Sequence, residues 1–249
     1  MATIDGLSMN HRLSWKVLKN PLFCLTLLAI AMNLSSIKKN ANASNDGTRK
    51  IVLIGASVGY SWRFSDLSSR INAAPYSFEY VELYQFDKSE ALNSVLSRPN
   101  LPSAIILKEC AAYFPGDLEL YKSLMTSWID QCLEKKVIPI PTTVVPVTWS
   151  HNVINGFKMI IKRAIGRINK MYGLSRIDGI LAYNDWIKEY AQSRGLVVLD
   201  LEAAVRVSPE DRYLRNELSS GDGLHLNNEA YKILDAIVLP TLEQVQWKR

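Results

Sequence analysis

Short apolar segments alternate with longer amphipathic segments along most of this chain, and the alternation limits the folds it can adopt. Short apolar runs are typical of buried strands, and apolar residues at helical spacing are typical of helices that cover a sheet. Alternation of the two favours a parallel sheet with helices on both faces, so the expected fold class is α/β, a three-layer α/β/α sandwich with a five-stranded, mostly parallel sheet. We predict strands over 50–54, 78–84, 104–107, 137–145 and 196–201, and helices over 117–135, 153–171 and 177–193.

A serine follows the first predicted strand. The strand 50–54 stops at Gly55, and Ser57 comes where the chain turns toward a helix. Sites in parallel sheets form at the carboxyl ends of strands. A serine hydroxyl is a weak nucleophile at neutral pH and reacts only beside a base that takes its proton. Ser57 is therefore a candidate nucleophile that requires a partner elsewhere in the chain.

The segment Asp222-Gly223-Leu224-His225 provides such a partner, with one of only three histidines in the sequence. The unperturbed pKa of histidine, roughly 6.5, suits a general base. A carboxylate three residues earlier can hold the imidazole in the required tautomer. Asn227 is the expected N-cap of a closing helix over 228–238. The alternative is that Ser57 is a turn serine and His225 a helix-cap histidine, neither with a catalytic role. The presence of both motifs favours catalysis.

These two motifs resemble those of the SGNH or GDSL-type esterases. Gly55-Ala56-Ser57-Val58 stands where that family has Gly-Asp-Ser-Leu, and the segment from Asp222 to Asn227 matches its Asp-x-x-His block. The resemblance covers about residue 50 to the C-terminus and implies an SGNH-hydrolase, flavodoxin-like sheet. It also implies a triad of Ser57, Asp222 and His225.

The chain departs from this family where the oxyanion hole is expected. The family has a Gly after its second strand and a Gly-x-Asn-Asp block after its third, and neither is present in the usual form. Lys108, Glu109 and Cys110 occupy the second block, with Cys110 in the Asn place. A thiol is a weaker hydrogen-bond donor than an amide, and losing one oxyanion donor can cost about a hundredfold or more in rate. The sequence predicts either a rebuilt oxyanion hole or a slow enzyme.

Lys108 has two interpretations. Its ammonium group can lie near the developing oxyanion, or it can form an ion pair with Glu109 or Asp87. Ion pairs at strand ends are the commoner role.

Residues 1–43 have the three-part order of a secretory signal peptide. A basic region precedes an apolar stretch, and Ala41-Asn42-Ala43 follows as a cleavage sequence. The apolar stretch is shorter than the roughly 20 residues that span a bilayer. Lys38 and Lys39 are untypical of a cleaved leader, which leaves an uncleaved anchor as the alternative. We expect a leader or anchor over 1–43, a linker over 44–49, an SGNH-hydrolase-like domain over 50–249, and a periplasmic or extracellular location.

Without residues 1–43, 24 Lys and Arg stand against 23 Asp and Glu, a formal charge of +1. No basic stripe with interleaved aromatic residues is present, so nucleic acid is not an expected partner. One predicted helix nevertheless has a local basic cluster, which is either a solvated face, the favoured interpretation, or an anion-binding surface. The cluster consists of Lys158, Lys162, Arg163, Arg167 and Lys170.

The remaining chemically active residues indicate no metal or cofactor. Cys110 and Cys132 form either a disulfide or two buried free thiols, and free thiols are favoured. No Cys/His group has zinc-ligand spacing. Trp62 either stacks on a sugar or packs against the first helix, with packing favoured. His151 either lines a pocket after the fourth strand or is a loop histidine without a catalytic role, and the second is favoured because no carboxylate is adjacent.

The predicted function is an exported serine esterase that hydrolyses a small acyl ester, such as an O-acetyl group on a carbohydrate. The expected partner is a small-molecule or carbohydrate ester, and the membrane is contacted only through the N-terminal segment if it stays uncleaved. Two alternatives use the same fold. One is an O-acyltransferase acting on envelope polysaccharide, and the other is a non-catalytic SGNH-like binding protein.

Overall fold

The computed structural model describes residues 47–165 and 175–247. The chain divides into two units, Met1–Gly47 and Thr48–Arg249, and the description below concerns the second. The predicted leader and most of the predicted linker lie outside the described residues, as does the end of the predicted helix 153–171.

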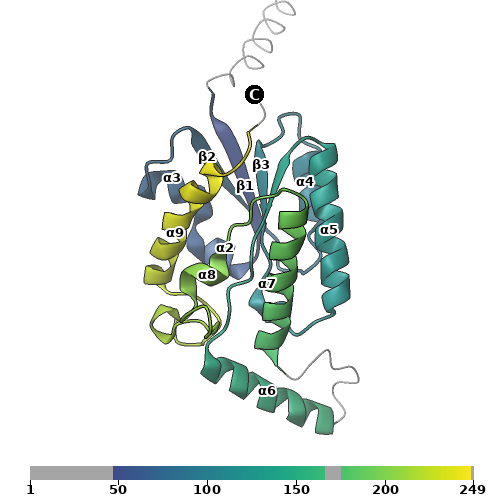
Figure 1. Cartoon of the computed structure of the whole chain (residues 1–249), viewed down its shortest axis with the longest axis vertical. Coiled ribbons are helices and arrows are strands. Elements are labelled where there is room, and N and C mark those ends of the chain that lie inside the picture. The colour runs from purple at the N-terminus through teal and green to yellow at the C-terminus, as the bar shows by residue number, and fades with distance from the viewer. Residues whose placement is uncertain (1–46, 166–174, 248–249) are drawn as a thin grey trace, which may run out of the picture. The chain divides into compact units, whose positions relative to one another are not determined.

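A four-stranded parallel sheet forms the centre of the fold, in the order β2-β1-β3-β4 (Figure 1). Leu53 of β1 pairs with Tyr80 of β2 on one side and with Ile106 of β3 on the other. The four strands agree with four of the five predicted ones, although β4 ends earlier than expected. They are β1 (Arg49–Gly55), β2 (Tyr76–Glu82), β3 (Ala104–Leu107) and β4 (Ile138–Pro141).

The predicted fifth strand over 196–201 is wrong. Only one isolated parallel bridge, between Thr142 and Leu199, continues the sheet past β4. The chain turns into a helix immediately afterwards, because the Asp200 side chain caps α8 (Leu201–Val205) by accepting from Ala203 N–H. On the other side of the bridge, Val144 N–H donates to Asn184 Oδ1 at 2.7 Å instead of to a strand. The α/β class is unaffected.

Helices cover both faces of the sheet, as the alternation predicted. Side chains of β1 alternate between two apolar cores. Ile51 and Leu53 pack with α2, α3, α8 and α9, whereas Val52 and Ile54 pack with α4, α5 and α7. The fold is therefore a three-layer α/β/α sandwich. The remaining elements are α2 (Ser57–Trp62), η2 (Phe64–Asp66), α3 (Leu67–Arg70), α4 (Ser89–Leu96), η3 (Ala111–Tyr113), α5 (Leu118–Glu134), α6 (Trp149–Ala164), α7 (Arg176–Ser193), η4 (Asn216–Leu218) and α9 (Asn228–Glu243).

Side-chain caps explain where the long helices begin. Asn227 accepts from Ala230 N–H at 3.1 Å and starts α9, which confirms the predicted N-cap. Asp117 and Ser175 cap α5 and α7 in the same way. Within the two described segments, none of the helices is both long and apolar enough to cross a bilayer.

Candidate active site

Ser57 lies at the turn between β1 and α2, as predicted. It is the first residue of α2, so its N–H has no acceptor within the helix. The Tyr80 hydroxyl from the neighbouring strand donates to the carbonyl oxygens of Gly55 and Ala56, at 3.2 and 3.0 Å. A Cβ at Gly59 would lie 2.6 Å from the Tyr80 ring, so this glycine allows the ring to pack against the turn. The backbone turn that leads into Ser57 is thus held by the strand beside it.

Asp222 and His225 are in direct contact. Nδ1 of His225 lies 2.5 Å from Asp222 Oδ2, while Asp222 Oδ1 accepts from the backbone N–H groups of Leu224 and His225, both at 2.8 Å. Partial burial alone would raise the pKa of Asp222, but these hydrogen bonds outweigh it and hold the pKa well below its usual value. A carboxylate at Nδ1 leaves Nε2 as the atom that can take a proton from a nucleophile.

The backbone around Asp222 rests on the start of α6. Thr148 N–H donates to the Gly223 carbonyl at 2.9 Å, and His151 Nδ1 lies 2.8 Å from the Asp222 carbonyl oxygen. Gly223 has a φ of +74°, and a Cβ there would lie 2.4 Å from Thr148 Oγ1. His151 therefore supports the loop that carries the candidate acid and base. The sequence gave no indication of this contact, because His151 and Asp222 are 71 residues apart.

A buried carboxylate joins α2, which carries Ser57, to α9, which follows the Asp222 loop. Asp235 of α9 accepts from Trp62 Nε1 at 2.7 Å and from Arg70 Nε and Nη2 at 2.7 and 2.9 Å. Trp62 is only 1% exposed, so it is a packing residue and the sugar-stacking interpretation is wrong. It is itself the last residue of α2 and packs on Phe64, not against the first helix as predicted. In the described part of the chain no hydrogen bond joins Ser57 to His225. Such bonds often form only when substrate is bound.

Cys110 lies beside Ser57. Its Sγ is 3.8 Å from Ser57 Oγ, and the side chain is buried. The residue in the Asn place of the related oxyanion block is thus close to the candidate nucleophile. Cys110 and Cys132 are both free thiols, which is the interpretation that the sequence favoured.

Lys108 and Glu109 point into the protein. Lys108 Nζ donates to the Glu109 carbonyl at 3.0 Å, and burial lowers the pKa of Lys108. The Glu109 carboxylate instead lies 3.4 Å from Lys88 Nζ. Burial raises the pKa of Glu109 to about 8, although both lysines oppose the shift. Lys88, which the sequence did not single out, therefore takes the place beside the Glu109 carboxylate that was expected of Lys108. The other predicted partner, Asp87, accepts from Ser89 N–H at 2.9 Å, so neither ion pair predicted for Lys108 is found among the described residues.

Arg176 brings a further cation to this region. It begins α7 and donates through Nη1 to the Ala111 carbonyl at 3.1 Å and through Nη2 to Asn155 Oδ1 at 3.4 Å. Ala111 directly follows Cys110, so the guanidinium lies at the border of the candidate site. The sequence gave no indication of this placement, because it depends on how α7 packs against η3.

Two further features bear on ligands. Within the described residues, no group of three or more His, Cys, Asp or Glu side chains lies close enough to hold a metal ion. A cavity of about 400 Å³ opens between the start of α6 and the loop that carries Asp222. Its lining consists of Thr148, Ser150, His151, Ile154, Asn155, Lys158, Asn216, Ser219, Gly221, Asp222 and Gly223.

Comparison with known proteins identifies the fold. No family model and no curated protein matches the sequence. A GDSL-like lipase from Bacteroides thetaiotaomicron is similar in structure, with a TM-score of 0.58 at 17% identity over 85% of this chain and 97% of that one. The lipase/acylhydrolase from Enterococcus faecalis gives a TM-score of 0.53 at 17% identity, over 81% and 100%. A psychrotrophic esterase from a Pseudoalteromonas species gives 0.53 at 9%, over 79% and 97%. The described part of this chain has the fold of the SGNH or GDSL hydrolases.

Proposed function

We propose that the protein is a serine hydrolase that cleaves a small acyl ester through Ser57, His225 and Asp222. The contact of 2.5 Å between Asp222 and His225 carries this proposal, because it orients the imidazole as a general base needs. Ser57 on the strand-to-helix turn and the similarity to lipases and acylhydrolases support it.

The reaction proceeds through an acyl-enzyme. His225 takes the proton from Ser57 Oγ while the oxygen attacks the ester carbonyl, and the Ser57 N–H donates to the oxyanion. The alcohol leaves with the proton from His225. Water, activated by the same imidazole, then releases the acid and restores the serine. Asp222 stays ionised throughout and stabilises the imidazolium.

The location and the substrate class follow from the leader pattern and the resemblance. We propose that residues 1–43 direct export to the periplasm or beyond, and that the substrate is an ester of the cell envelope, such as an O-acetyl group on a carbohydrate. An acyltransferase would use the same three residues and pass the acyl group to a sugar hydroxyl. Product analysis with and without added acceptor separates the two reactions.

Covalent labelling tests whether Ser57 is activated. We expect a fluorophosphonate probe to modify the protein at Ser57, because the probe reacts with serines that a base has activated. The psychrotrophic esterase with the same fold was crystallised inhibited by monoethylphosphonate. Mass spectrometry of the labelled peptide is the measurement, with Ser57→Ala as control. If the folded protein takes up no label, Ser57 is not activated. That result would indicate a non-catalytic binding protein and overturn the proposal.

Cys110→Asn tests the oxyanion side of the site. An amide is a stronger donor than a thiol, and position 110 lies beside Ser57. We expect this variant to raise kcat on p-nitrophenyl acetate by about tenfold. Cys110→Ala is the control and should change kcat far less, because little donation is lost. A kcat that does not rise in folded Cys110→Asn would show that position 110 donates nothing to the oxyanion.

A further inference from the structure

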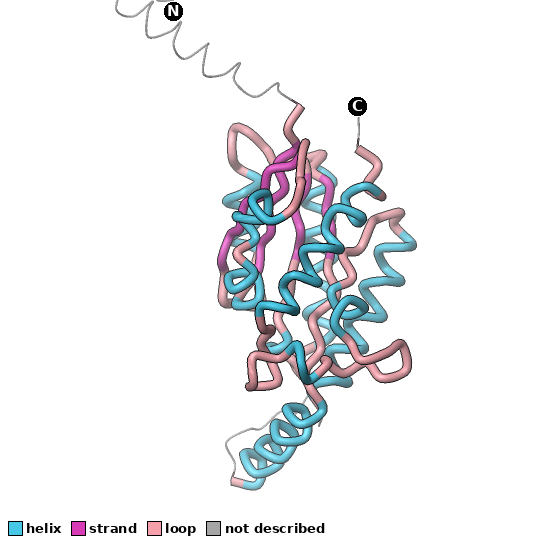
Figure 2. The backbone as a smooth tube through the Cα atoms, turned by 90° about the vertical axis from the view of Figure 1, so that its left-hand side faces the viewer, coloured by secondary structure: helices cyan, strands magenta, loops and turns pink. Residues whose placement is uncertain are grey.

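Helix α6 is held to the rest of the described fold at its first turns. The Asn152 side chain donates to Ser175 Oγ at 3.1 Å and accepts from Ile177 N–H at 3.0 Å. His151 contacts the Asp222 carbonyl, as described above. Figures 1 and 2 show the rest of the helix extending beyond the other helices, on the side of the sheet where the strands end. Most of its length is therefore open to a partner.

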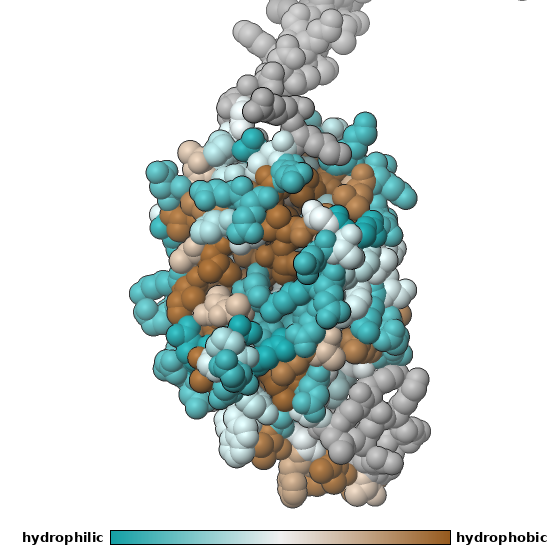
Figure 3. All heavy atoms as spheres, in the orientation of Figure 1, coloured by the Kyte–Doolittle hydropathy of each residue, from teal (hydrophilic) through white to brown (hydrophobic). Residues whose placement is uncertain are grey.

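The open side of α6 is apolar. Trp149 is 62% exposed and Phe157 66%, far more than is usual for such side chains. Of the thirteen large apolar side chains exposed in the described residues, seven lie between 149 and 165. Figure 3 shows this hydrophobic end of the molecule. A clustered apolar surface of this kind marks an interaction site. Its members are Trp149, Val153, Ile154, Phe157, Ile160, Ile161 and Ile165.

The charge of the same segment has one sign. From residue 149 to 177 the sequence has six Lys and Arg and no Asp or Glu. Lys158 and Lys162 are exposed, and neither forms an ion pair with a carboxylate in the described part of the chain. An apolar helix face with Trp and Phe beside lysines, on a helix that itself has no acidic residue, is typical of helices that lie in the interface of an anionic membrane.

The charge also distinguishes the membrane from a second copy of the chain. Two α6 helices packed through their apolar faces would bring lysines of like charge together, without an acidic residue on either helix to offset them. Anionic headgroups instead complement these lysines, while the apolar side chains enter the acyl boundary.

We infer that α6 docks the protein on a membrane surface that carries anionic lipids. The helix lies in the plane of the interface with Phe157 and Ile160 buried among the acyl chains and Lys158 and Lys162 at the headgroups. Because the first turns of α6 support the Asp222 loop and line the cavity beside it, docking brings the candidate site to the membrane surface. On the proposed function, the substrate is then an ester presented at that surface.

Site-specific fluorescence tests the docking in the full-length chain. A fluorophore is attached at Ile160→Cys or, as matched control, at Leu120→Cys on exposed α5, both with Cys24→Ser so that the leader stays unlabelled. Each protein is mixed with phosphatidylcholine vesicles containing nitroxide-labelled lipid, with or without phosphatidylglycerol. We expect quenching at position 160 with the anionic vesicles and none at position 120.

Substitutions of the lysines and of the apolar face distinguish membrane docking from self-association. Lys158→Gln with Lys162→Gln should weaken binding to anionic vesicles by about fivefold per lysine. Quenching at 160 that is absent, or equal with and without phosphatidylglycerol, overturns the inference, and so does equal quenching at both positions. Self-association without vesicles that Phe157→Ser abolishes would assign the face to a second copy instead. The measurement uses no turnover, so failure of the catalytic proposal leaves it unchanged.

Discussion

Replacing Ser57 with alanine should lower the turnover of p-nitrophenyl acetate by at least about a thousandfold. In the proposed mechanism the substitution removes the oxygen that forms the acyl-enzyme, so residual catalysis can come only from binding and oxyanion contacts. Asp222→Asn should cost about as much, because an amide in place of the carboxylate no longer selects the tautomer with Nε2 free. The measurement is kcat/KM for each purified variant.

Ser61→Ala is the matched control for Ser57→Ala. Ser61 lies on the same short helix and is exposed, so its loss should leave turnover within about twofold, as for most surface substitutions. Turnover by folded Ser57→Ala that equals the Ser61→Ala value would reject the serine mechanism. Unfolding curves of both variants show whether the fold is intact.

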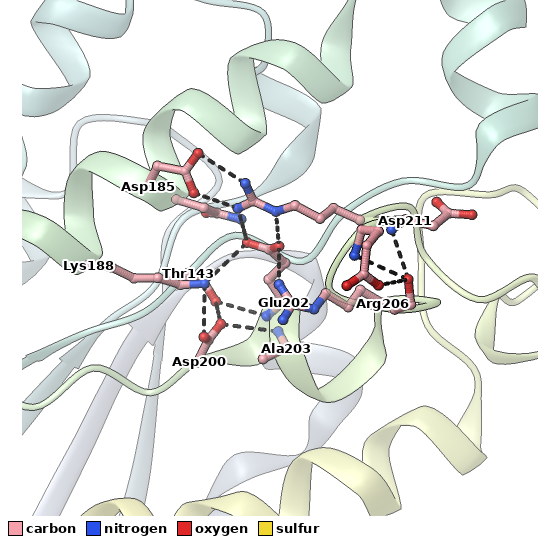
Figure 4. A network of polar contacts seen from close by, with 12 residues as sticks. Thr143, Asp185, Lys188, Asp200, Glu202, Ala203, Arg206 and Asp211 are labelled. Atoms are coloured by element: carbon pink, nitrogen blue, oxygen red, sulfur yellow. Dashed lines mark hydrogen bonds and ion pairs between the residues drawn. The ribbon is translucent and has the colours of Figure 1, made fainter.

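Glu202→Gln should lower the free energy of unfolding by about 3–5 kcal/mol. The Glu202 side chain is fully buried, and its oxygens accept from Arg212 Nε at 2.5 Å, Arg212 Nη2 at 2.8 Å and Asn184 Nδ2 at 2.9 Å. Figure 4 shows the carboxylate among the side chains of Lys188, Arg206 and their neighbours. An amide would remove the buried negative charge that faces Arg212, Arg206 and Lys188, and Arg212 would keep only its pair with Asp185. Urea unfolding at neutral pH measures the loss.

Acid should have the same effect as this substitution. Burial of Glu202 raises its pKa, but the arginine, lysine and asparagine contacts lower it by more, so that the pKa is about 2 instead of its ordinary value of 4.5. A carboxylate whose pKa is lower in the folded state stabilises the fold above the unfolded-state pKa. That contribution should disappear as the pH falls from about 4.5 to about 2, and Glu202→Gln should lack this part of the acid sensitivity.

Glu229→Gln is the control for the buried site. Glu229 is paired with Lys232 at 2.7 Å, but its side chain is 67% exposed, so its loss should change stability by less than about 0.5 kcal/mol. Equal stability of the Glu202 and Glu229 variants would show that the network in Figure 4 contributes nothing.

Features determined by local chemistry were predicted from the sequence. Asn227 caps its helix through a contact three residues away, and the turn at Ser57 follows from an apolar strand that stops at a glycine. The Asp222–His225 contact also spans only three residues. In each case the residues that determine the structure are neighbours in the chain.

Features that depend on packing between distant segments were not predicted. Asn184 takes the hydrogen bonds that would have extended β4, so the predicted fifth strand shrinks to one bridge. Lys88 rather than Lys108 pairs with Glu109. The contact of His151 with the Asp222 carbonyl joins residues 71 apart. No periodicity or motif in the sequence indicates which of several possible partners a side chain will contact.

The link between Trp62 and Asp235 has a consequence for how the protein is made. The indole and its acceptor are separated by 173 residues. At about 5–20 residues per second, a ribosome needs roughly 10–35 s to add Asp235 after Trp62. Throughout that time α2, which begins with Ser57, has been synthesised, but its Trp62 lacks the hydrogen bond to Asp235. On the proposed function, Ser57 is therefore activated only after the last helix has folded, and a nascent chain does not expose a reactive serine.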